Sequence, residues 1–292
     1  MTQHIGIVAG SAEGASLCYR TICVEGMQLL GGYAHPEVSM HTLPLADYAH
    51  CLVQDDWKGV AGLMLASASK LAKIGADFLV CPDNSFHRAL PYVEPRSPVP
   101  WLHIAAVVAE HAAGRGFRRV GLTGMRVLVE SEVYPDKLTT RGLEYVRPDD
   151  DEREEINRII VDELVFGVFK PEAVAYFQRV ITRLKDTGCD AVVLGCTEIP
   201  LMMNDSNSPL PTLDSTRLLA RAALHRAVHG STVKTRAEPR RLVVWLVRSS
   251  GVHGGQTARA WGWVLPCASI RCSRSLRSVR VNLQVNGRAI WL

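Results

Sequence analysis

A short sequence that occurs twice constrains the fold of this chain more than any other feature. The first copy, IGADFLVCPDNS, spans residues 74–85, and the second, TGCDAVVLGCTE, spans residues 187–198. In both copies a glycine and an aspartate precede a short apolar run, which ends in a polar tripeptide. An apolar run of this kind behind a tight turn is typical of a buried parallel strand. The repeat therefore predicts two similar strand units, one in each half of the chain.

A second pair of similar segments supports an internal duplication. IGIVAG at residues 5–10 resembles VGLTG at residues 120–124, and the two pairs are separated by nearly the same number of residues. Strand-like and helix-like segments alternate over residues 1–228, which favours parallel α/β layers. Ligands of such sheets bind at the carboxyl ends of the strands, so we expect a site between two similar halves.

The pattern of apolar residues predicts the individual elements. Strands are expected at residues 4–10, 38–43, 77–82, 101–104, 119–123, 143–146, 190–195 and 209–214. Helices are expected at residues 14–31, 57–74, 84–92, 105–115, 131–138, 149–166, 171–186 and 215–228. We divide the chain into a first α/β domain (residues 1–110 plus about 208–228), a second α/β domain (111–207) and a C-terminal extension (231–292).

The C-terminal extension differs in composition from the rest of the chain. Residues 231–292 contain 11 Lys/Arg and one acidic residue, whereas residues 1–230 contain 22 basic and 28 acidic residues. The strand-like stretches 242–247 and 279–285 of the extension lack partner helices. Two interpretations remain open: a basic β-rich module that binds an acidic partner, or a segment that was appended or arose from an altered reading frame. We favour the second, and under either interpretation we expect the extension to pack poorly on the main body. Because residues 1–230 are acidic overall, we do not expect the main body to bind nucleic acid.

The composition of the whole chain is that of a soluble globular protein, with 47% apolar and 21% charged residues. No apolar run is long enough to span a membrane, and the first residues, MTQHIGIVAG, lack the basic region of a signal peptide. The eight cysteines are scattered without CxxC pairs, and no His/Cys/Asp cluster has the spacing of a metal site. We therefore expect a cytoplasmic protein with no metal and no membrane partner.

Two reactive side chains follow the repeated strands. Cys196 comes directly after the second strand, where the N-terminus of a following helix would lower the pKa of its thiol. Asp83 follows the first strand, where burial would raise the pKa of its carboxyl group. Each also has a structural interpretation, Cys196 as an inert core thiol and Asp83 as a helix cap.

Short polar residues beside these two groups are candidate ligands for a carboxylate. Asn84, Ser85 and Thr197 stand at expected helix starts, where hydroxyl, amide and backbone N–H groups bind anions or cap the helix. Lys170, in FGVFKPEA, could pair with a second substrate carboxylate if it faces the cleft, and would otherwise be a solvated charge. His87, in NSFHRA, is expected to pack or cap a helix rather than to catalyse.

At CPDNS and GCTE the sequence resembles the aspartate/glutamate racemase superfamily, over about residues 3–228. Further matches are Gly6-Ile7-Val8, VPWLHI, VGLTG…VESEVY, GVFK and GCTEIPL, of which the last is the most specific. The resemblance implies two Rossmann-like (flavodoxin-like) α/β domains with parallel sheets, related by a pseudo-twofold axis, with a cleft between them. It also implies a homodimer and a cofactor-independent reaction, in which two bases, typically cysteines, move the α-proton of an amino acid.

The resemblance assigns roles residue by residue. Cys196 matches the second catalytic cysteine, and Asp83 stands where the first one is usual, with Cys81 two residues too early to replace it. Lys170 matches a lysine that helps to hold the distal carboxylate in aspartate-type members. The expected substrate contacts are Asn84, Ser85, Thr197, Lys170, Ser11 and Glu198.

Two departures concern substrate choice. Met125 and Leu128 stand where threonines are usual in the superfamily, so two carboxylate-binding hydroxyl groups are expected to be missing. The first turn reads AGSAEG instead of the usual Gly-Met-Gly-Pro start.

We therefore expect a racemase of an acidic amino acid such as aspartate or glutamate, with Asp83 and Cys196 acting on opposite faces of the α-carbon. Two alternatives remain open. One is a single-cysteine lyase, decarboxylase or cis–trans isomerase of the same superfamily, and the other is a non-catalytic protein that binds a carboxylate.

Overall fold

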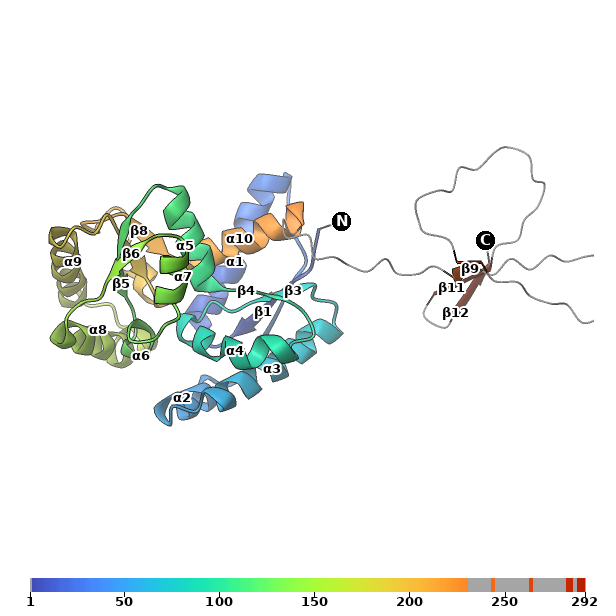
Figure 1. Ribbon diagram of the computed structural model, residues 1–292, viewed down its shortest axis with the longest axis horizontal. Helices are drawn as coiled ribbons and strands as arrows, with labels where there is room; N and C mark the ends of the chain where they lie inside the picture. The colour runs from blue at the N-terminus through green and yellow to red at the C-terminus, as the bar shows by residue number, and fades with distance from the viewer. Residues whose placement is uncertain (1, 231–242, 245–262, 265–281, 286–287, 292) are drawn as a thin grey trace, which may run out of the picture. The chain divides into compact units, whose positions relative to one another are not determined.

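Two parallel four-stranded sheets organise the main body of the computed structural model, which describes residues 2–230 and four short strands between residues 243 and 291 (Figure 1). The first sheet has the order β2-β1-β3-β4 and consists of β1 (Ile5–Ala9), β2 (Val38–Thr42), β3 (Phe78–Val80) and β4 (Trp101–Leu102). The second has the order β6-β5-β7-β8 and consists of β5 (Arg119–Thr123), β6 (Glu144–Val146), β7 (Ala191–Leu194) and β8 (Thr212–Asp214). The identical order in the two sheets confirms the predicted fold of two similar parallel α/β units.

The repeated glycine and aspartate have matching structural roles in the two sheets. Gly75 and Gly188 have φ angles of 100° and 92°, in the left-handed region that favours glycine. Asp77 and Asp190 each accept a 2.7 Å hydrogen bond from a backbone N–H just before the neighbouring strand. The repeat therefore sets the start of β3 beside β1 and the start of β7 beside β5.

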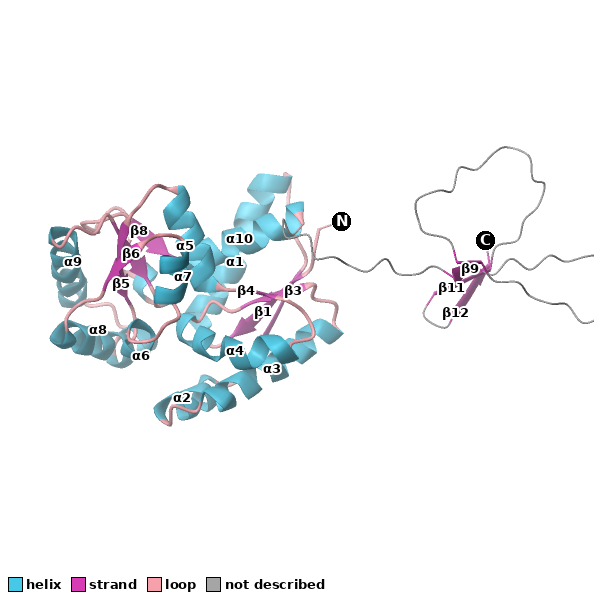
Figure 2. Cartoon of the chain, in the orientation of Figure 1, coloured by secondary structure: helices cyan, strands magenta, loops and turns pink. Residues whose placement is uncertain are grey.

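Helices pack on both sheets (Figure 2). Those associated with the first sheet are α1 (Ala12–Leu30), α2 (Leu45–Val53), α3 (Trp57–Lys73), α4 (Leu90–Val93) and α10 (Ser215–His229). Helix α5 (Ile104–Gly114) contacts both units, because Ile104 clusters with β1 and its other buried residues cluster with β5 and β7. Those of the second are α6 (Arg126–Val129), α7 (Pro135–Thr140), α8 (Asp150–Asp162) and α9 (Pro171–Asp186). Single 3-10 turns or short 3-10 helices occur at Asn84–Ala89, Glu94–Arg96, Leu164–Phe166 and Ile199–Leu201.

The central strands β1 and β3 of the first sheet are buried on both faces. On one face Leu79 of β3 belongs to the same apolar cluster as Met64 of α3. On the other face Ile5 of β1 clusters with Ile22 of α1 and Leu219 of α10. Burial on both faces is the reason why these strands read as continuous apolar runs rather than as alternating patterns.

Several elements differ from the sequence prediction. The helix expected at residues 84–92 is a 3-10 helix over Asn84–Ala89 followed by α4, and α6 was not predicted. The helix expected at residues 131–138 begins instead at Pro135, because proline is favoured at the first helical position, where its missing N–H is not needed. The helix expected over 149–166 ends at Asp162 and is followed by a 3-10 turn and by Gly167 with φ 71°. Helix α2 was not predicted, although it contributes to the site described below.

The return of the chain to the first sheet occurs later than the expected boundary near residue 208. Strand β8 pairs with β7 in the second sheet, with Val193 opposite Leu213. Helix α10, which begins at Ser215, then packs against α1 and α5. The chain therefore crosses back from the second sheet to the first at the junction of β8 and α10.

Beyond residue 230 the structure describes two pairs of short strands. Strand β9 (Val243–Val244) pairs with β10 (Trp263–Val264), and β11 (Asn282–Val285) pairs with β12 (Arg288–Trp291), both antiparallel. Strands β9 and β11 fall inside the two strand-like stretches that the sequence indicates. The predicted poor packing of the extension concerns residues that lie mostly outside the described ranges. None of the described helices has the length and apolar character that a membrane span requires.

Candidate active site

The loops after β3 and β7 bring Asp83 and Cys196 to one cavity of about 270 Å³. Because both side chains follow the carboxyl end of a parallel strand, each lies where α/β sheets place ligands. Five of the six predicted substrate contacts also line this cavity: Ser11, Asn84, Ser85, Thr197 and Glu198. Residues that are far apart in the sequence, from Ser11 to Glu198, therefore line one site.

Asp83 is held against the first turn of α1. Its Oδ2 accepts a hydrogen bond from the backbone N–H of Gly10 and its Oδ1 accepts one from Ser11, each 3.0 Å long. Burial raises the pKa of Asp83 to about 6, although the two N–H groups stabilise the carboxylate and oppose that rise. The direction agrees with the sequence prediction. Near neutral pH the group is a carboxylate that can act as a base.

Cys196 forms a buried pair with Glu198. The thiol Sγ donates a hydrogen bond to Glu198 Oε2 at 2.9 Å, and both residues are buried. Burial raises the pKa of Cys196 well above its ordinary value, and the adjacent Glu198 carboxylate adds to the rise. The prediction that a helix N-terminus lowers this pKa is wrong, because only the single 3-10 turn Ile199–Leu201 follows the loop. Cys196 is therefore a neutral thiol in the resting site.

The two reactive loops meet at the start of α1. Ser11 caps this helix by accepting a hydrogen bond from the N–H of Gly14, and its Oγ lies 3.0 Å from Thr197 Oγ1. A Cβ atom added to Gly14 would lie 2.4 Å from Thr197 Cγ2, which is closer than such atoms approach. The absence of a side chain at Gly14 therefore allows the first turn of α1 to pack against the Cys196 loop.

Asn84 lines the cavity, but both ends of its side-chain amide are already bonded. Its Oδ1 accepts a hydrogen bond from the hydroxyl of Tyr134 at 2.7 Å, and its Nδ2 donates to Ser215 Oγ at 3.0 Å. Ser215 in turn donates to the carbonyl of Leu194, the last residue of β7, at 2.8 Å. This buried chain of bonds connects the Asp83 loop to the strand that precedes Cys196. Sequence reasoning did not select Tyr134 or Ser215, although Tyr134 ends the VESEVY match.

Lys170 lies outside the lining of the cavity. It precedes α9, its side chain is about half exposed, and its Nζ is 3.2 Å from Glu163 Oε1. Glu163 also pairs with Arg158 at 2.9 Å. The structure therefore places Lys170 in a surface ion cluster and does not bring it to Asp83 and Cys196.

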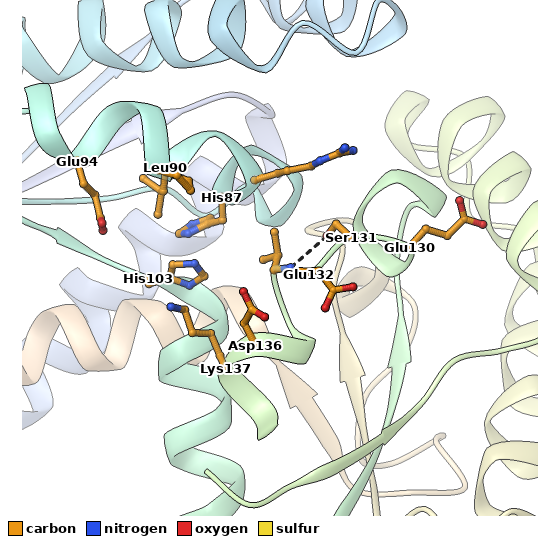
Figure 3. Close-up of a pocket in the computed structure, with 12 residues that line it drawn as sticks. His87, Leu90, Glu94, His103, Glu130, Ser131, Glu132, Asp136 and Lys137 are labelled. Atoms are coloured by element: carbon orange, nitrogen blue, oxygen red, sulfur yellow. Dashed lines mark hydrogen bonds between the residues drawn. The ribbon is translucent and has the colours of Figure 1, made fainter. Parts of the chain in front are cut away.

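A second and larger cavity, of about 380 Å³, shares no lining residue with the first (Figure 3). Its His87 and His103 rings lie 4.8 Å apart. His87 accepts a hydrogen bond from the N–H of Ile104 and lies 2.9 Å from the carbonyl oxygen of Cys81, while burial lowers its pKa to about 4. His87 is thus a neutral packing residue, and the described residues contain no group of three His, Cys, Asp or Glu side chains placed to hold a metal. The smaller cavity remains the candidate site because it is lined by the Cys196 thiol and by the Asp83 carboxyl group, whose pKa is raised.

Comparison with known proteins places this geometry in a family. The family model described as Asp/Glu/Hydantoin racemase matches residues 16–223. The broad specificity amino-acid racemase RacX of Bacillus subtilis (strain 168) is 23% identical over 227 residues, which is 75% of this chain and 96% of that protein.

Solved structures show the same relationship. A protein of Yersinia pestis described as a candidate Asp/Glu racemase superposes with a TM-score of 0.72 at 30% identity, covering 77% of this chain and 99% of that one. An aspartate racemase homologue of Pyrococcus horikoshii OT3 gives a TM-score of 0.68 at 28% identity, covering 78% and 100%. Since the family match covers most of the main body with both reactive loops inside it, this chain belongs to the Asp/Glu/hydantoin racemase family.

Proposed function

We propose that this chain is an amino-acid racemase that moves the α-proton of its substrate between Asp83 and Cys196. One observation carries the proposal: two proton-handling side chains follow equivalent strands of two like sheets and line one cavity. A racemase needs one group on each face of the α-carbon, one to remove the proton and one to return it. The family relationship supports this reaction class.

The resting protonation states suit one direction of the reaction. The Asp83 carboxylate takes the proton as the Cα–H bond breaks, and the electron pair passes into the substrate as a carbanion conjugated with its carboxylate. The Cys196 thiol then gives its proton to the opposite face, which leaves Asp83 protonated and Cys196 as a thiolate. The reverse direction starts from that second state. Glu198 positions the thiol proton, because its Oε2 already accepts a hydrogen bond from the S–H group of Cys196.

The charges of the lining suit an amino acid. Asp83 and Glu198 are carboxyl groups, and the described lining contains no Lys, Arg or His. A substrate ammonium group would be stabilised beside them, and the substrate carboxylate would lie on backbone N–H groups at Ser85 and Thr197. A dicarboxylic acid without an amine would meet two carboxyl groups and no cation. The expectation of an acidic substrate side chain depended on Lys170 as the partner of its carboxylate. Because Lys170 does not line the cavity, this proposal concerns only the chemistry at the α-carbon.

The decisive experiment follows the α-proton by NMR in D2O, using the full chain and a panel of L- and D-amino acids. The proposal predicts loss of the α-proton signal together with appearance of the enantiomer. Exchange without any enantiomer, or no exchange with any amino acid of the panel, would contradict it.

A single-cysteine lyase or decarboxylase is the second candidate, and one observation favours it. Both oxygens of Asp83 are bonded to the backbone N–H groups of Gly10 and Ser11, so this carboxylate is anchored as a structural group would be. In that case Cys196 alone would protonate the product. The same NMR experiment separates the two functions, because a lyase consumes its substrate and incorporates a single deuterium without forming an enantiomer.

The pH dependence of the proposed reaction follows from the two ionisations. The productive free enzyme has an Asp83 carboxylate and a Cys196 thiol, so kcat/KM should rise through about pH 6 and fall only above the ordinary range of thiols. Because the two enantiomers are equally stable, kcat/KM must be equal in both directions at every pH, and any asymmetry appears in kcat and KM separately. Initial rates for both enantiomers between about pH 4.5 and 9.5 would test this. A profile that is flat through about pH 6 would remove Asp83 from the reaction.

Gly14→Ala is expected to damage the site through the contact with Thr197. The added methyl group would push Thr197 away from Ser11, lowering kcat/KM about tenfold or more and destabilising the fold by roughly 1–3 kcal/mol. Kinetics and chemical denaturation would measure both effects. The matched control is Gly62→Ala in α3, where a Cβ meets nothing within 4 Å. That variant should keep its activity and gain up to about 1 kcal/mol, and equal losses in both variants would contradict the assignment.

A further inference from the structure

We propose that the side chain of the substrate is apolar and of about the size of leucine or methionine, rather than the carboxylate of aspartate or glutamate. This inference rests on the proposed racemase function and names the substrate class of the same site. It is supported by the distribution of apolar and polar groups around the cavity and by the ion pairs of two cations that border an adjoining cavity.

The cavity has a polar end and an apolar wall. The polar end consists of the strand-end loops that carry Asp83 and Cys196 with their neighbours. The apolar wall comes from helices of both halves: α2 supplies Leu45, Ala49 and Leu52, while α8 and the turn after it supply Val161, Val165 and Phe166. Met125, which precedes α6, and Phe86 complete it.

The position of the reacting carbon directs the substrate side chain to this wall. The α-carbon must lie between Asp83 and Cys196, and the substrate ammonium and carboxylate groups need the polar end. The only remaining substituent of the α-carbon is the side chain. It therefore points away from the strand-end loops, and the part of the lining left for it is apolar.

No cation of the described lining is placed to receive a second carboxylate. Two cations, Arg88 and Arg126, border an adjoining cavity that shares Leu52, Met125 and Val161 with the site. Both already have acidic partners. Arg88 lies 3.4 Å from Asp55, and Arg126 lies 2.9 Å from Glu130 and 2.6 Å from Glu154. A substrate carboxylate on the apolar wall would lose its hydration without gaining a partner.

The exposure of the wall favours an apolar occupant. Val161 is 40%, Val165 41% and Phe166 75% exposed. Covering such side chains with an apolar group removes their surface from water and stabilises the complex, whereas a charged group placed there would lose its own hydration. The cavity volume of about 270 Å³ equals that of roughly nine water molecules, which suits an amino acid of leucine or methionine size.

Substrates of similar size and different polarity provide the test. Leucine, asparagine and aspartate form one isosteric series, and methionine, glutamine and glutamate form a second series of similar length. We expect kcat/KM of the full chain to fall along each series, with leucine and methionine at least about 100-fold above the corresponding acids. A higher kcat/KM for aspartate or glutamate than for leucine or methionine would overturn the inference and leave the racemase function standing.

A variant of the apolar wall provides a second test, which changes the protein instead of the substrate. Met125→Lys adds a cation on a side chain of similar length and should raise kcat/KM for glutamate relative to methionine by tenfold or more. Met125→Gln is the matched neutral control, and it should lower activity on methionine without that gain for glutamate. An unchanged preference in Met125→Lys would place the substrate side chain elsewhere.

Ligand binding decides the question if no amino acid is turned over. Thermal unfolding of the full chain with each amino acid at a concentration of about 10 mM reports binding without chemistry. A larger rise in Tm with leucine or methionine than with aspartate or glutamate supports the apolar wall as the side-chain site, even if the racemase function fails. Stabilisation by the acids alone, or by no member of either series, overturns the inference.

Discussion

Replacing Cys196 by alanine is expected to reduce racemisation in both directions by a factor of about 10³ or more. The variant removes the group that works on one face of the α-carbon, and a positioned acid or base contributes about 10²–10⁴-fold to the rate. Proton transfer on the Asp83 face remains possible, because the Asp83 carboxylate keeps its two backbone bonds and its place in the cavity. We therefore expect one enantiomer to exchange its α-proton with D2O without inversion.

The matched control for this variant is Cys189→Ala. Cys189 is also a buried thiol of the second half, but it lies before β7 in the apolar core and does not line the cavity. Its replacement should lower the free energy of unfolding by roughly 1 kcal/mol and leave kcat/KM within about twofold. Steady-state polarimetry with chemical denaturation would measure both quantities. Full racemisation by Cys196→Ala would show that another group serves this face.

The sequence was sufficient to predict the strands that carry the reactive groups. A Gly-x-Asp turn before an apolar run has a local cause, since Gly75 and Gly188 adopt the left-handed conformation and the aspartates bond to the neighbouring strand. Because these causes act within a few residues or between paired strands, the two copies fold alike. The resemblance of the two copies was thus enough to predict that Asp83 and Cys196 occupy equivalent positions.

The environment of those groups was harder to predict, because it depends on contacts between distant segments. The pKa of Cys196 is raised by its burial and by Glu198, and nothing in the short sequence GCTE shows how deep the thiol lies. The amide of Asn84 is bonded to Tyr134 and Ser215, which are far from it along the chain. Only the packed structure shows that this side chain connects two loops.

The wall of the cavity was missed for a different reason. Helix α2 is a nine-residue amphipathic helix whose N-terminal residue lacks a side-chain capping bond, and it was not predicted. Leu45 is 40% exposed and Leu52 is half-buried, so α2 does not have the continuous buried face of a core helix. In the sequence Met125 only replaces a threonine that is usual in the superfamily. In the structure it lines the cavity, so this replacement makes the lining more apolar.

Replacing Asp83 by asparagine is expected to reduce racemisation by a factor of about 10²–10⁴, equally in both directions. An amide cannot take up the α-proton, so the reaction loses its base on one face and its acid in the reverse direction. The amide has one acceptor oxygen where the carboxylate has two, so one of the bonds from Gly10 and Ser11 is lost. We expect this loss to lower the free energy of unfolding by about 1 kcal/mol.

The control must separate this structural loss from the loss of the base, and Asp190→Asn does so. Asp190 likewise accepts hydrogen bonds from two backbone N–H groups, those of Arg118 at 2.7 Å and Arg119 at 3.2 Å, but it lies just before β7 and outside the cavity. Asp190→Asn should therefore be destabilised by a similar amount and still racemise. Parental rates in Asp83→Asn would make the two-base assignment wrong.

The exchange behaviour of Asp83→Asn then identifies the face on which each group acts. With Cys196 alone, exchange without inversion should be confined to the enantiomer that Cys196→Ala does not exchange. It should also be slower than the exchange supported by Asp83, because Cys196 rests as a thiol and must first transfer its proton, with Glu198 Oε2 at 2.9 Å as the nearest acceptor. If both single variants exchanged the same enantiomer, the two groups would act on one face, and racemisation by this pair would be impossible.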